Sequence, residues 1–313
     1  MNIAFWDNQL CERGTSVSLY DYAHYNEKIL GNTSYIFYNK NNSENKEPII
    51  EKFKQRFIVH GVNSFNEVDF YLIKYKVSHI YVIKFGKNDS NKSSVAKTCN
   101  HCVFDASEPH GDVYAAVSKC VKGYTDSIPI VSHMIDLPNH TLNMREELSI
   151  PADAIVFGGY GGANSFDIKY VHEVIYDVAK ENKHMYFLFA NFNRFCPELP
   201  NIIHLPMITS MDKKTAFINT CDAQIWGCSL GETFGIAIGE FSMKNKPIIA
   251  SKVGTLNHAL ILKEKGLWYQ CPEELRDIFV TFYPKESKTK ELNAYTEYTP
   301  EKVMRQFNEV FLQ

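Results

Sequence analysis

The chain has 313 residues, a length that predicts about two domains at roughly 150 residues each. Hydrophobic residues make up 45% and charged residues 22%, which are ordinary globular values and exclude a disordered chain, a collagen and a simple coiled coil. The 33 Lys and Arg stand against 36 Asp and Glu, for a net charge of −3, so the chain lacks the basic field that nucleic-acid binding rewards. We therefore expect no nucleic-acid partner.

The amino-terminal residues MNIAFWDNQL contain no basic stretch followed by a long apolar core, so no secretory signal is expected. No run of about 18 apolar residues occurs, so no transmembrane helix is expected either. The 8 cysteines are scattered and mostly lie in apolar runs, which is typical of reduced thiols in a cytoplasmic protein. Cys99 and Cys102 form a C-x-x-C around His101. Because a second pair is missing, structural thiols are favoured over a metal site.

Short β-rich segments alternate with helical patterns in the first half of the chain. The predicted strands are residues 2–6, 34–39, 56–62, 79–85 and 101–106, and the predicted helices are 17–29 and 67–76. The polar stretches 40–47 and 86–97 contain few apolar side chains and are predicted to be surface loops. Continuous apolar strands that alternate with helices predict a parallel sheet covered on both faces.

A second series of the same kind follows the proline-bearing stretch 127–138. Its predicted strands are 154–160, 185–191, 201–206, 223–228 and 247–251, and its predicted helices are 167–180, 212–219 and 234–244. The last residues begin with a capping-box pattern and are predicted to form a terminal helix. The sequence thus predicts an α/β protein with two Rossmann-like domains. Their ranges are 1–132 and 133–297, with 298–313 as the terminal helix.

The segment from Gly231 to Glu240 carries the strongest chemical signal. A predicted strand ends in a glycine-bearing turn and a helix begins near Phe234, so free N–H groups and the positive end of the helix dipole face the same place. This arrangement predicts an anion-binding site. Glu232 lies in the turn and Glu240 lies two turns along the helix, and carboxylates are good acceptors for pairs of sugar hydroxyls.

This segment resembles the E-x7-E signature of the GT-B glycosyltransferases, in particular the large retaining group that uses nucleotide sugars, family four. Glu232 and Glu240 have the family's spacing with Phe-Gly between them, and the strand 247–251 also agrees. The resemblance implies that Glu240 binds the ribose of the nucleotide and that Glu232 contacts the donor sugar. The backbone after Glu232 would hold the diphosphate, through the residues Thr233, Phe234, Gly235 and Ile236.

The first domain offers a second match to the family. Family members often have a glycine-bearing loop after the first strand, and here Gly14 would let the backbone approach the transferred sugar, beside Arg13 as a cation and Thr15. A single glycine before a helix is also an ordinary turn. Residues 107–110 are similar to the H-E-P motif of some members, with Ser107 where His is expected. His110 is predicted to line the site instead, so that Glu232, His110 and Gly14 are the candidate catalytic residues.

The largest departure from the family concerns the diphosphate clamp. Members usually carry Arg and Lys after the first strand of the second domain, whereas this chain has a glycine-rich run with Gly159 and Ser165 at those places. Backbone N–H groups of this turn, including those of Gly159 and Gly161, are expected to hold phosphate instead. Lys169 or Arg194 would supply the positive charge.

The resemblance implies two parallel sheets that face a central cleft and a terminal helix that packs back on the first domain. It implies a glycosyltransferase that moves a sugar from a UDP- or GDP-linked donor to a carbohydrate or other glycan acceptor with retention of configuration. No Asp-x-Asp triplet suited to a divalent cation occurs, so we expect a metal-independent reaction without a further cofactor. Two alternatives stay open: a nucleotide-sugar epimerase on the same fold, and a non-catalytic nucleotide- or carbohydrate-binding protein, which the missing clamp would favour.

Overall fold

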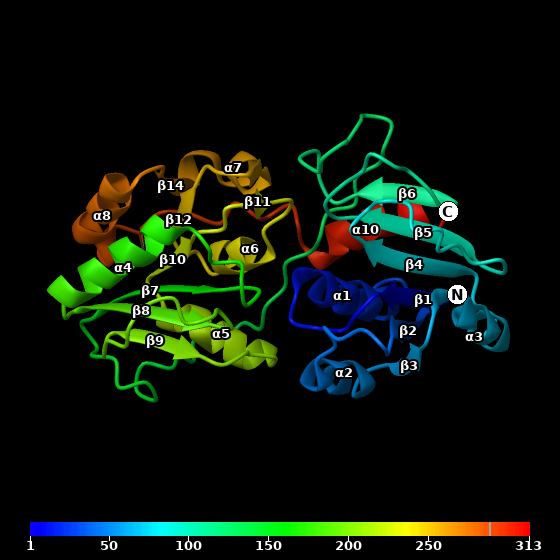
Figure 1. The fold of residues 1–313 in the computed structure, drawn as a ribbon, viewed down its shortest axis with the longest axis horizontal. Coiled ribbons are helices and arrows are strands. Elements are labelled where there is room, and N and C mark those ends of the chain that lie inside the picture. Colours follow the sequence, from blue (N-terminus) through cyan, green and yellow to red (C-terminus); the bar gives the residue numbers. More distant parts are fainter. Residues whose placement is uncertain (288) are drawn as a thin grey trace. The chain divides into compact units, whose positions relative to one another are not determined.

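The computed structural model describes residues 1–287 and 289–313. The chain divides into two units: unit 1 comprises Met1–Met134 together with Glu297–Gln313, and unit 2 comprises Ile135–Thr296. Each unit contains a six-stranded parallel sheet with helices between its strands (Figure 1). The prediction of two Rossmann-like units with parallel sheets is therefore confirmed.

The sheet of unit 1 has the strand order β3-β2-β1-β4-β5-β6. The elements of this unit are, in chain order, β1 (Asn2–Asp7), α1 (Gly14–Lys28), β2 (Thr33–Asn39), α2 (Glu47–Lys54), β3 (Ile58–Val62), the 3-10 helix η1 (Phe65–Glu67), α3 (Val68–Lys74), β4 (His79–Lys84), β5 (Lys97–Cys102), β6 (Val113–Ala116) and α10 (Pro300–Phe311). The first strand pairs with β2 on one edge and with β4 on the other. The order of the strands reverses there, so the topological switch point of unit 1 lies between β1 and β4.

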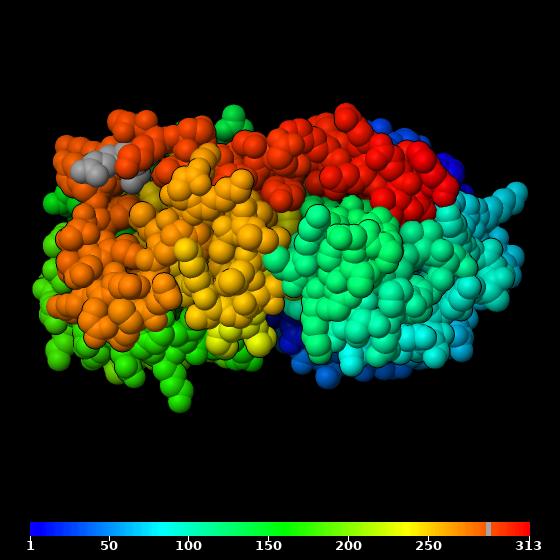
Figure 2. Space-filling view, turned by 90° about the horizontal axis from the view of Figure 1, so that it is seen from above, coloured from blue at the N-terminus to red at the C-terminus, as the bar shows by residue number. Residues whose placement is uncertain are grey.

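The last helix of the chain, α10, packs within unit 1. Its side chains Val303, Phe307 and Phe311 form a fully buried apolar stripe at helical spacing. The ring of Phe307 contacts those of Phe5 in β1 and Tyr81 in β4, and the helix contacts α1 and β6. In Figure 2 the red carboxyl-terminal residues lie beside the cyan and green residues of the same unit. The carboxyl terminus thus completes the core of the amino-terminal unit.

The sheet of unit 2 has the order β14-β12-β10-β7-β8-β9, which is the same topology as in unit 1. The elements of this unit are β7 (Ile155–Tyr160), α4 (Lys169–Glu181), β8 (Met185–Ala190), β9 (Ile202–Leu205), α5 (Met211–Thr220), β10 (Ala223–Trp226), β11 (Gly231–Glu232), α6 (Ile236–Met243), β12 (Ile248–Ser251), β13 (Thr255–Leu256), α7 (Asn257–Leu262), the 3-10 helix η2 (Lys263–Lys265), β14 (Gly266–Tyr269), α8 (Pro272–Thr281) and α9 (Pro284–Ser287). Its switch point lies between β7 and β10, the two strands that start the two halves of the sheet.

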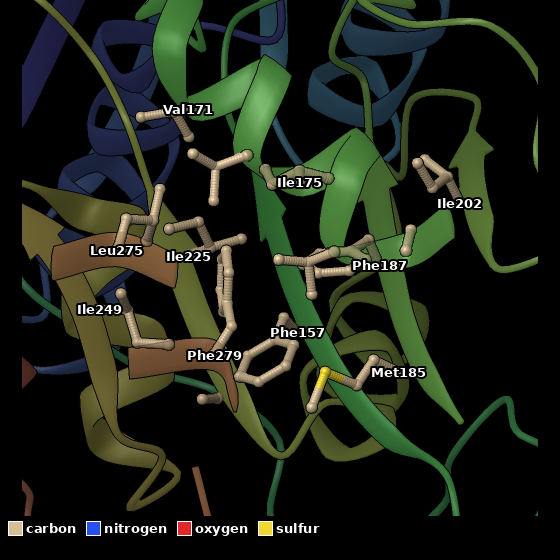
Figure 3. Packing of buried hydrophobic residues seen from close by; sticks show 14 of the residues in the cluster. Phe157, Val171, Ile175, Met185, Phe187, Ile202, Ile225, Ile249, Leu275 and Phe279 are labelled. Atoms are coloured by element: carbon tan, nitrogen blue, oxygen red, sulfur yellow. The ribbon is translucent and has the colours of Figure 1, made fainter. Parts of the chain in front are cut away.

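The core of unit 2 lies between its sheet and the helices α4 and α8 (Figure 3). Val171 and Ile175 of α4 face the sheet at helical spacing, and Phe279 of α8 lies 4.7 Å from the ring of Phe157 and 5.2 Å from that of Phe187. Each of these side chains is fully buried, and burial of such a side chain contributes about 1.5–3 kcal/mol. This core fixes β7, whose carboxyl end carries part of the site.

The structure corrects the predicted bounds in three places. The strand predicted at 101–106 is β5, Lys97–Cys102, because Phe104 N–H and Asp105 N–H turn back to the carbonyl of Phe85. The helix expected near Phe234 begins at Ile236, after Gly235 with a left-handed φ of 86°. The predicted loop 40–47 ends where α2 begins, with Pro at the start of the helix. The elements that the sequence analysis did not predict are α2, η1, β6, β11, β13, α7, η2, β14, α8 and α9.

The cysteines are all free thiols. Cys99 and Cys102 lie three positions apart in β5, so their side chains point to opposite faces of the sheet. The thiol of Cys99 donates to the carbonyl of Phe311 at 3.2 Å, and that of Cys102 donates to the carbonyl of Phe85 at 3.5 Å. Both thiols therefore have acceptors within unit 1. Within residues 1–287 and 289–313, no group of three His, Cys, Asp or Glu side chains is placed to hold a metal ion. None of the helices described is long and apolar enough to cross a bilayer.

Candidate functional site

The carboxyl ends of β7 and β10 lie next to each other at the switch point of unit 2. The two strands pair through Phe157 with Ala223 and Gly158 with Gln224. Ligands of open parallel α/β sheets bind in the crevice outside the strand ends at this point. The predicted glycine-rich run and the predicted turn with Glu232 follow these two strands, so the fold brings both motifs to the same edge of one sheet.

The glycines at the end of β7 and after it allow close packing of the backbone. A Cβ at Gly159 would lie 2.7 Å from the carbonyl oxygen of Ile225, and one at Gly161 would lie 2.7 Å from Ser165 Oγ. Ser165 in turn donates from its N–H and its hydroxyl to the carbonyl of Gly162, at 2.9 and 2.8 Å. Gly161 thus shapes the turn, whereas Gly159 lies within β7, buried and paired with Phe189 of β8, so its amide does not belong to the turn as expected.

The turn itself, residues 161–164, has amides to offer. In the part of the chain that the structure describes, the backbone N–H groups of Gly162, Ala163 and Asn164 donate to no protein acceptor. The turn is tied to the loop after β10, because Ser229 donates from its N–H (2.7 Å) and its hydroxyl (2.6 Å) to the carboxylate of Asp167. Successive free amides of this kind form an anion-binding concavity.

The start of α6 adds a second set of amides. Gly235 precedes the helix, which has no side-chain cap and no acidic residue in its first turn. The first N–H groups of a helix lack intrahelical acceptors and carry the positive end of its dipole. Gly231 directs this turn: its φ is 73°, and a Cβ there would lie 2.2 Å from the backbone N and O of Thr255 in β13. The helix start therefore remains open to an anion.

Glu232 lies in β11, before this helix start, and is held by an indole. Trp226 Nε1 donates to Glu232 Oε1 at 2.9 Å. Burial raises the pKa of Glu232 to about 7, against the opposing effect of the Trp226 hydrogen bond. The Trp226 ring lies 4.4 Å from that of His258, whose Nε2 donates to the carbonyl of Ser251 at 3.0 Å. Glu232 is thus a carboxyl group whose pKa lies near neutral pH.

Glu240 lies inside the same unit, and both of its oxygens have partners. Lys214 Nζ of α5 lies 2.7 Å from Glu240 Oε1, and the hydroxyl of Tyr160, at the end of β7, donates to Oε2. The side chains of Lys214 and Glu240 are 11% and 4% exposed. Burial raises the pKa of Tyr160 well above its usual value, and the negative charge of Glu240 adds to this shift. The three side chains form a buried network between three elements, which we call the Lys214 network.

The other predicted residues of unit 2 have differing surroundings. Thr233 is half-buried in the turn, and Phe234 is buried with its carbonyl accepting from the Tyr295 hydroxyl at 3.1 Å. Lys169 is exposed at the first position of α4. Arg194 pairs with Glu198 at 3.1 Å and lines a groove of about 450 Å³ along β9. Neither cation takes part in the contacts described above for Glu232 and Glu240.

The predicted residues of unit 1 lie in two places, at the start of α1 and in the loop between β5 and β6. Gly14 and Thr15 open α1, after β1, and Arg13 is the cap residue of that helix. The guanidinium of Arg13 lies 3.0 Å from Glu44, and both side chains are more than half exposed. The helix start has no side-chain cap, as at α6.

His110 lies in the loop between β5 and β6. Its Nε2 lies 2.8 Å from Lys84 Nζ and its Nδ1 lies 2.7 Å from the carbonyl of Glu108. An ammonium only donates and a carbonyl only accepts, so Nε2 is the acceptor and Nδ1 carries the proton. Lys84 is 3% exposed and also pairs with Asp89. Both ring nitrogens of His110 are therefore occupied within unit 1.

The sequence analysis did not predict Lys214, Tyr160 or Trp226 as residues of the site, and Lys214 is the charged one among them. It lies on the buried face of α5 together with Phe217 and Ile218. A lysine on the apolar stripe of a helix is an available signal, because lysine is rarely buried without a partner. The sequence does not indicate which residue that partner is, because the contact between Lys214 of α5 and Glu240 of α6 depends on the tertiary packing.

The sequence matches no protein-family model, and no curated protein is similar enough to match it. Solved structures do resemble the whole chain. A glycosyltransferase from Rickettsia africae has a TM-score of 0.69 at 14% identity, over 99% of this chain and 97% of that one. The Anabaena protein HepE, solved with UDP-glucose, has a TM-score of 0.73 at 14% identity, over 99% and 98%. Sucrose-phosphate synthase from Thermosynechococcus elongatus has a TM-score of 0.70 at 13% identity, over 99% and 98%.

At these identities the likeness establishes the fold. The chain has the two-unit α/β fold of the GT-B glycosyltransferases, with a six-stranded parallel sheet in each unit.

Proposed function

We propose that this chain is a glycosyltransferase that binds a nucleotide-diphosphate sugar at the switch point of unit 2 and transfers the sugar to a glycan acceptor. The observation that carries the proposal is the open start of α6, which faces the same sheet edge as the free amides of residues 162–164. An anion site beside the carboxylates Glu232 and Glu240 suits a ligand that has both phosphates and hydroxyls. The fold shared with glycosyltransferases supports the same reading.

In this proposal, different residues contact different parts of the donor. Amides of Phe234, Gly235 and Ile236 at the helix start hold the diphosphate, with those of the turn after Gly161. Glu240 accepts hydrogen bonds from the ribose hydroxyls, and Glu232 meets the donor sugar. As the bond from sugar to phosphate breaks, negative charge grows on the phosphate, and fixed amides stabilise that charge without reorganisation.

The finer predictions of the sequence analysis belong to the same proposal. They are retention of configuration, independence of metal ions, and a site in unit 1 formed by Arg13, Gly14, Thr15 and His110. The location in the cytoplasm, inferred from the scattered cysteines, also stays a prediction.

Calorimetric titration of UDP, GDP and UDP-glucose into the protein tests donor binding. We expect one nucleoside diphosphate to bind in the micromolar range, which corresponds to about −8 kcal/mol. No heat and no thermal shift with either nucleotide at millimolar concentration would contradict the proposal. NMR of the nucleotide sugar over time, with and without added glycan acceptors, then distinguishes the alternatives. Sugar passed to an acceptor or released to water indicates a transferase, an isomerised sugar indicates an epimerase, and a donor that stays unchanged with acceptors present indicates a binding protein.

Substitutions of the two glutamates test their different roles in donor binding. Glu240→Gln removes an interaction with the nucleotide itself, so the affinity for the nucleoside diphosphate should fall about tenfold to a hundredfold, the value of a charged hydrogen bond. Glu232→Gln should leave that affinity unchanged and alter only the affinity for, or turnover of, the nucleotide sugar. Equal nucleotide affinities in the wild type and both variants would place the donor elsewhere.

A further inference from the structure

The charge of Glu240 raises a question that the proposed function leaves open. A carboxylate that is 4% exposed stands near a site meant for phosphates, and an unpaired charge there would be strongly unfavourable. Lys214 lies 2.7 Å from one of its oxygens and Tyr160 donates to the other. Two donors from different elements thus fix the carboxylate relative to the end of β7, the strand that leads into the glycine turn.

The hydrogen-bonding capacity of the Lys214 network is only partly used. The ammonium of Lys214 has three N–H groups and one protein acceptor, Glu240, among the described residues. Each oxygen of Glu240 has one partner and a second lone pair. The network therefore offers donors and acceptors side by side, at a buried place next to the switch point.

A sugar diol complements such a pair. Each hydroxyl donates one hydrogen bond and accepts others, so it meets a carboxylate and an ammonium at once. A phosphate only accepts and would meet the ammonium alone, leaving the carboxylate facing a like charge. The chemistry of the pair therefore favours vicinal hydroxyls over an anion.

We propose that Lys214 and Glu240 form a clamp for the ribose diol, in which Lys214 holds Glu240 together with Tyr160 and offers its remaining N–H groups to the same hydroxyls. Lys214 is then a specificity residue that selects ribonucleotides over deoxyribonucleotides. The inference rests on the proposed nucleotide-sugar function and extends it to a residue on α5. It assigns the buried cation of the site to Lys214, whereas Lys169 is exposed and Arg194 pairs with Glu198.

Calorimetry with a ribonucleotide and its deoxy forms tests the clamp. UDP, 2′-deoxy-UDP and 3′-deoxy-UDP, or the guanosine series if GDP binds more tightly, are titrated into wild type and Lys214→Met. In the wild type we expect UDP to bind about tenfold to a hundredfold more tightly than the deoxy forms, since each lost hydroxyl removes a hydrogen bond to a charged group. In Lys214→Met this ratio should fall to within about threefold. Lys213→Met, the exposed neighbour on the same helix, is the matched control and should keep the wild-type ratio.

The ratio distinguishes selection from support of the fold. If Lys214→Met weakens ribo- and deoxyribonucleotides equally, the residue only stabilises unit 2 and the clamp is wrong. An unchanged ratio with either Lys214→Met or Tyr160→Phe, or a lost ratio in Lys169→Met or Arg194→Met instead, also overturns it. Should Lys214→Met fail to fold by circular dichroism, Lys214→Gln and Tyr160→Phe give the same measurement. Absence of any nucleotide binding to the wild type would instead refute the proposed function.

Discussion

The two units share one strand order, yet their switch points differ in chemistry. In unit 2 the first strand ends in Tyr160 and leads into a turn with free amides. In unit 1 the first strand ends in Asp7, which is 3% exposed and accepts a hydrogen bond from Ser16 Oγ at 3.1 Å. Burial raises the pKa of Asp7 to about 7, despite the hydrogen bond from Ser16 that opposes the shift.

The comparison shows how much the topology decides and how much it leaves to residue type. Both switch points have a helix start without a side-chain cap and without an acidic residue in its first turn. Glycines and amides at the strand ends make the crevice of unit 2 suitable for an anion. A buried carboxyl at the corresponding place of unit 1 opposes an anion whenever it is ionised. The same topology thus carries different chemical groups at its two switch points.

The largest effect is expected from a glycine of unit 2. Gly231→Ala places a Cβ 2.2 Å from the backbone of Thr255 at a left-handed φ, so β11 must separate from β13 and Glu232 must move. We expect a loss of stability on the order of 3–5 kcal/mol and loss of nucleotide binding. Thermal unfolding and calorimetry measure the two effects.

Gly31→Ala of unit 1 is the control for this substitution. Gly31 also has a left-handed φ, of 67°, but no atom lies within 4 Å of the place of its Cβ. Its replacement should cost about 1–2 kcal/mol, the backbone strain alone, and leave nucleotide binding intact. Similar losses in the two variants would show that Gly231 matters only for its φ.

Asp7 predicts a pH dependence of stability in unit 1. Its folded pKa of about 7 lies above the ordinary value of 3.8, so the folded state binds the proton more tightly and this stabilisation is lost as the pH rises through 7. Asp7→Asn removes the ionisable group and should stabilise the protein at pH 8 by on the order of 2 kcal/mol, with little effect at pH 4. Denaturant unfolding at both pH values measures this difference.

Asp69→Asn should have the opposite sign and serves as the control. Burial raises the pKa of Asp69, but hydrogen bonds from Ser93 and Ser94 outweigh this effect and leave the pKa lowered. The folded state therefore favours the charged form of Asp69, and its replacement should destabilise the protein at pH 8. Stabilisation by both variants would indicate a general effect of charge instead of burial.

Trp226 is expected to set the pH range in which Glu232 is ionised. Its hydrogen bond lowers the pKa of Glu232 against the larger effect of burial, so Trp226→Phe should raise that pKa further above about 7. In the proposed donor site, an ionised Glu232 accepts hydrogen bonds from the sugar. In the wild type, the affinity advantage of UDP-glucose over UDP should therefore decline as the pH falls through 7. In Trp226→Phe the decline should occur at higher pH, so that at neutral pH the advantage is smaller than in the wild type by about tenfold or less.

Trp268→Phe is matched to this variant. Trp268 lies on the other side of His258, with its ring 6.0 Å from that of the histidine, and its indole donates to the carbonyl of Lys263. It should leave the pH profile unchanged. A profile that shifts equally in both variants, or in neither, would contradict a specific effect of Trp226 on Glu232.

The smallest effect is expected from chelation. If amides alone hold the diphosphate, EDTA should change neither the nucleotide affinity nor the rate of donor turnover. Loss of either with EDTA and recovery with Mn²⁺ or Mg²⁺ would contradict the metal-independent part of the proposal, while the difference between the two switch points would remain.

Much of the fold could be predicted because parallel strands buried on both faces are continuous apolar runs. β1 and β7 are such runs, and both were predicted within a residue or two. β14 and α8 were missed because their exposed and half-buried residues interrupt the apolar pattern. The carboxyl-terminal helix was predicted from its apolar stripe, and the structure has it at Pro300–Phe311.

The candidate site could be predicted only in its local part. Glu232 and Glu240 lie close in the sequence, so their spacing on a turn and helix is readable. Their partners are set by tertiary packing. Lys214 lies on α5, which precedes β10, and Tyr160 lies at the end of β7, in the other half of the sheet. The tautomer of His110, which lies in a loop, likewise depends on Lys84 at the end of β4. Such pairings follow from tertiary contacts that no local pattern contains.

The position of α10 in unit 1 has a consequence for the order in which the two units fold during synthesis. Unit 2 is one continuous segment, whereas unit 1 needs residues from both ends of the chain. During synthesis the sheet of unit 1 emerges first, but the side chains that cover it, Val303, Phe307 and Phe311, leave the ribosome last. Unit 2 can therefore finish folding while the rings of Phe5 and Tyr81 still lack their cover. Synthesis that stops before Val303 would release a chain with a complete unit 2 and an exposed aromatic surface on unit 1.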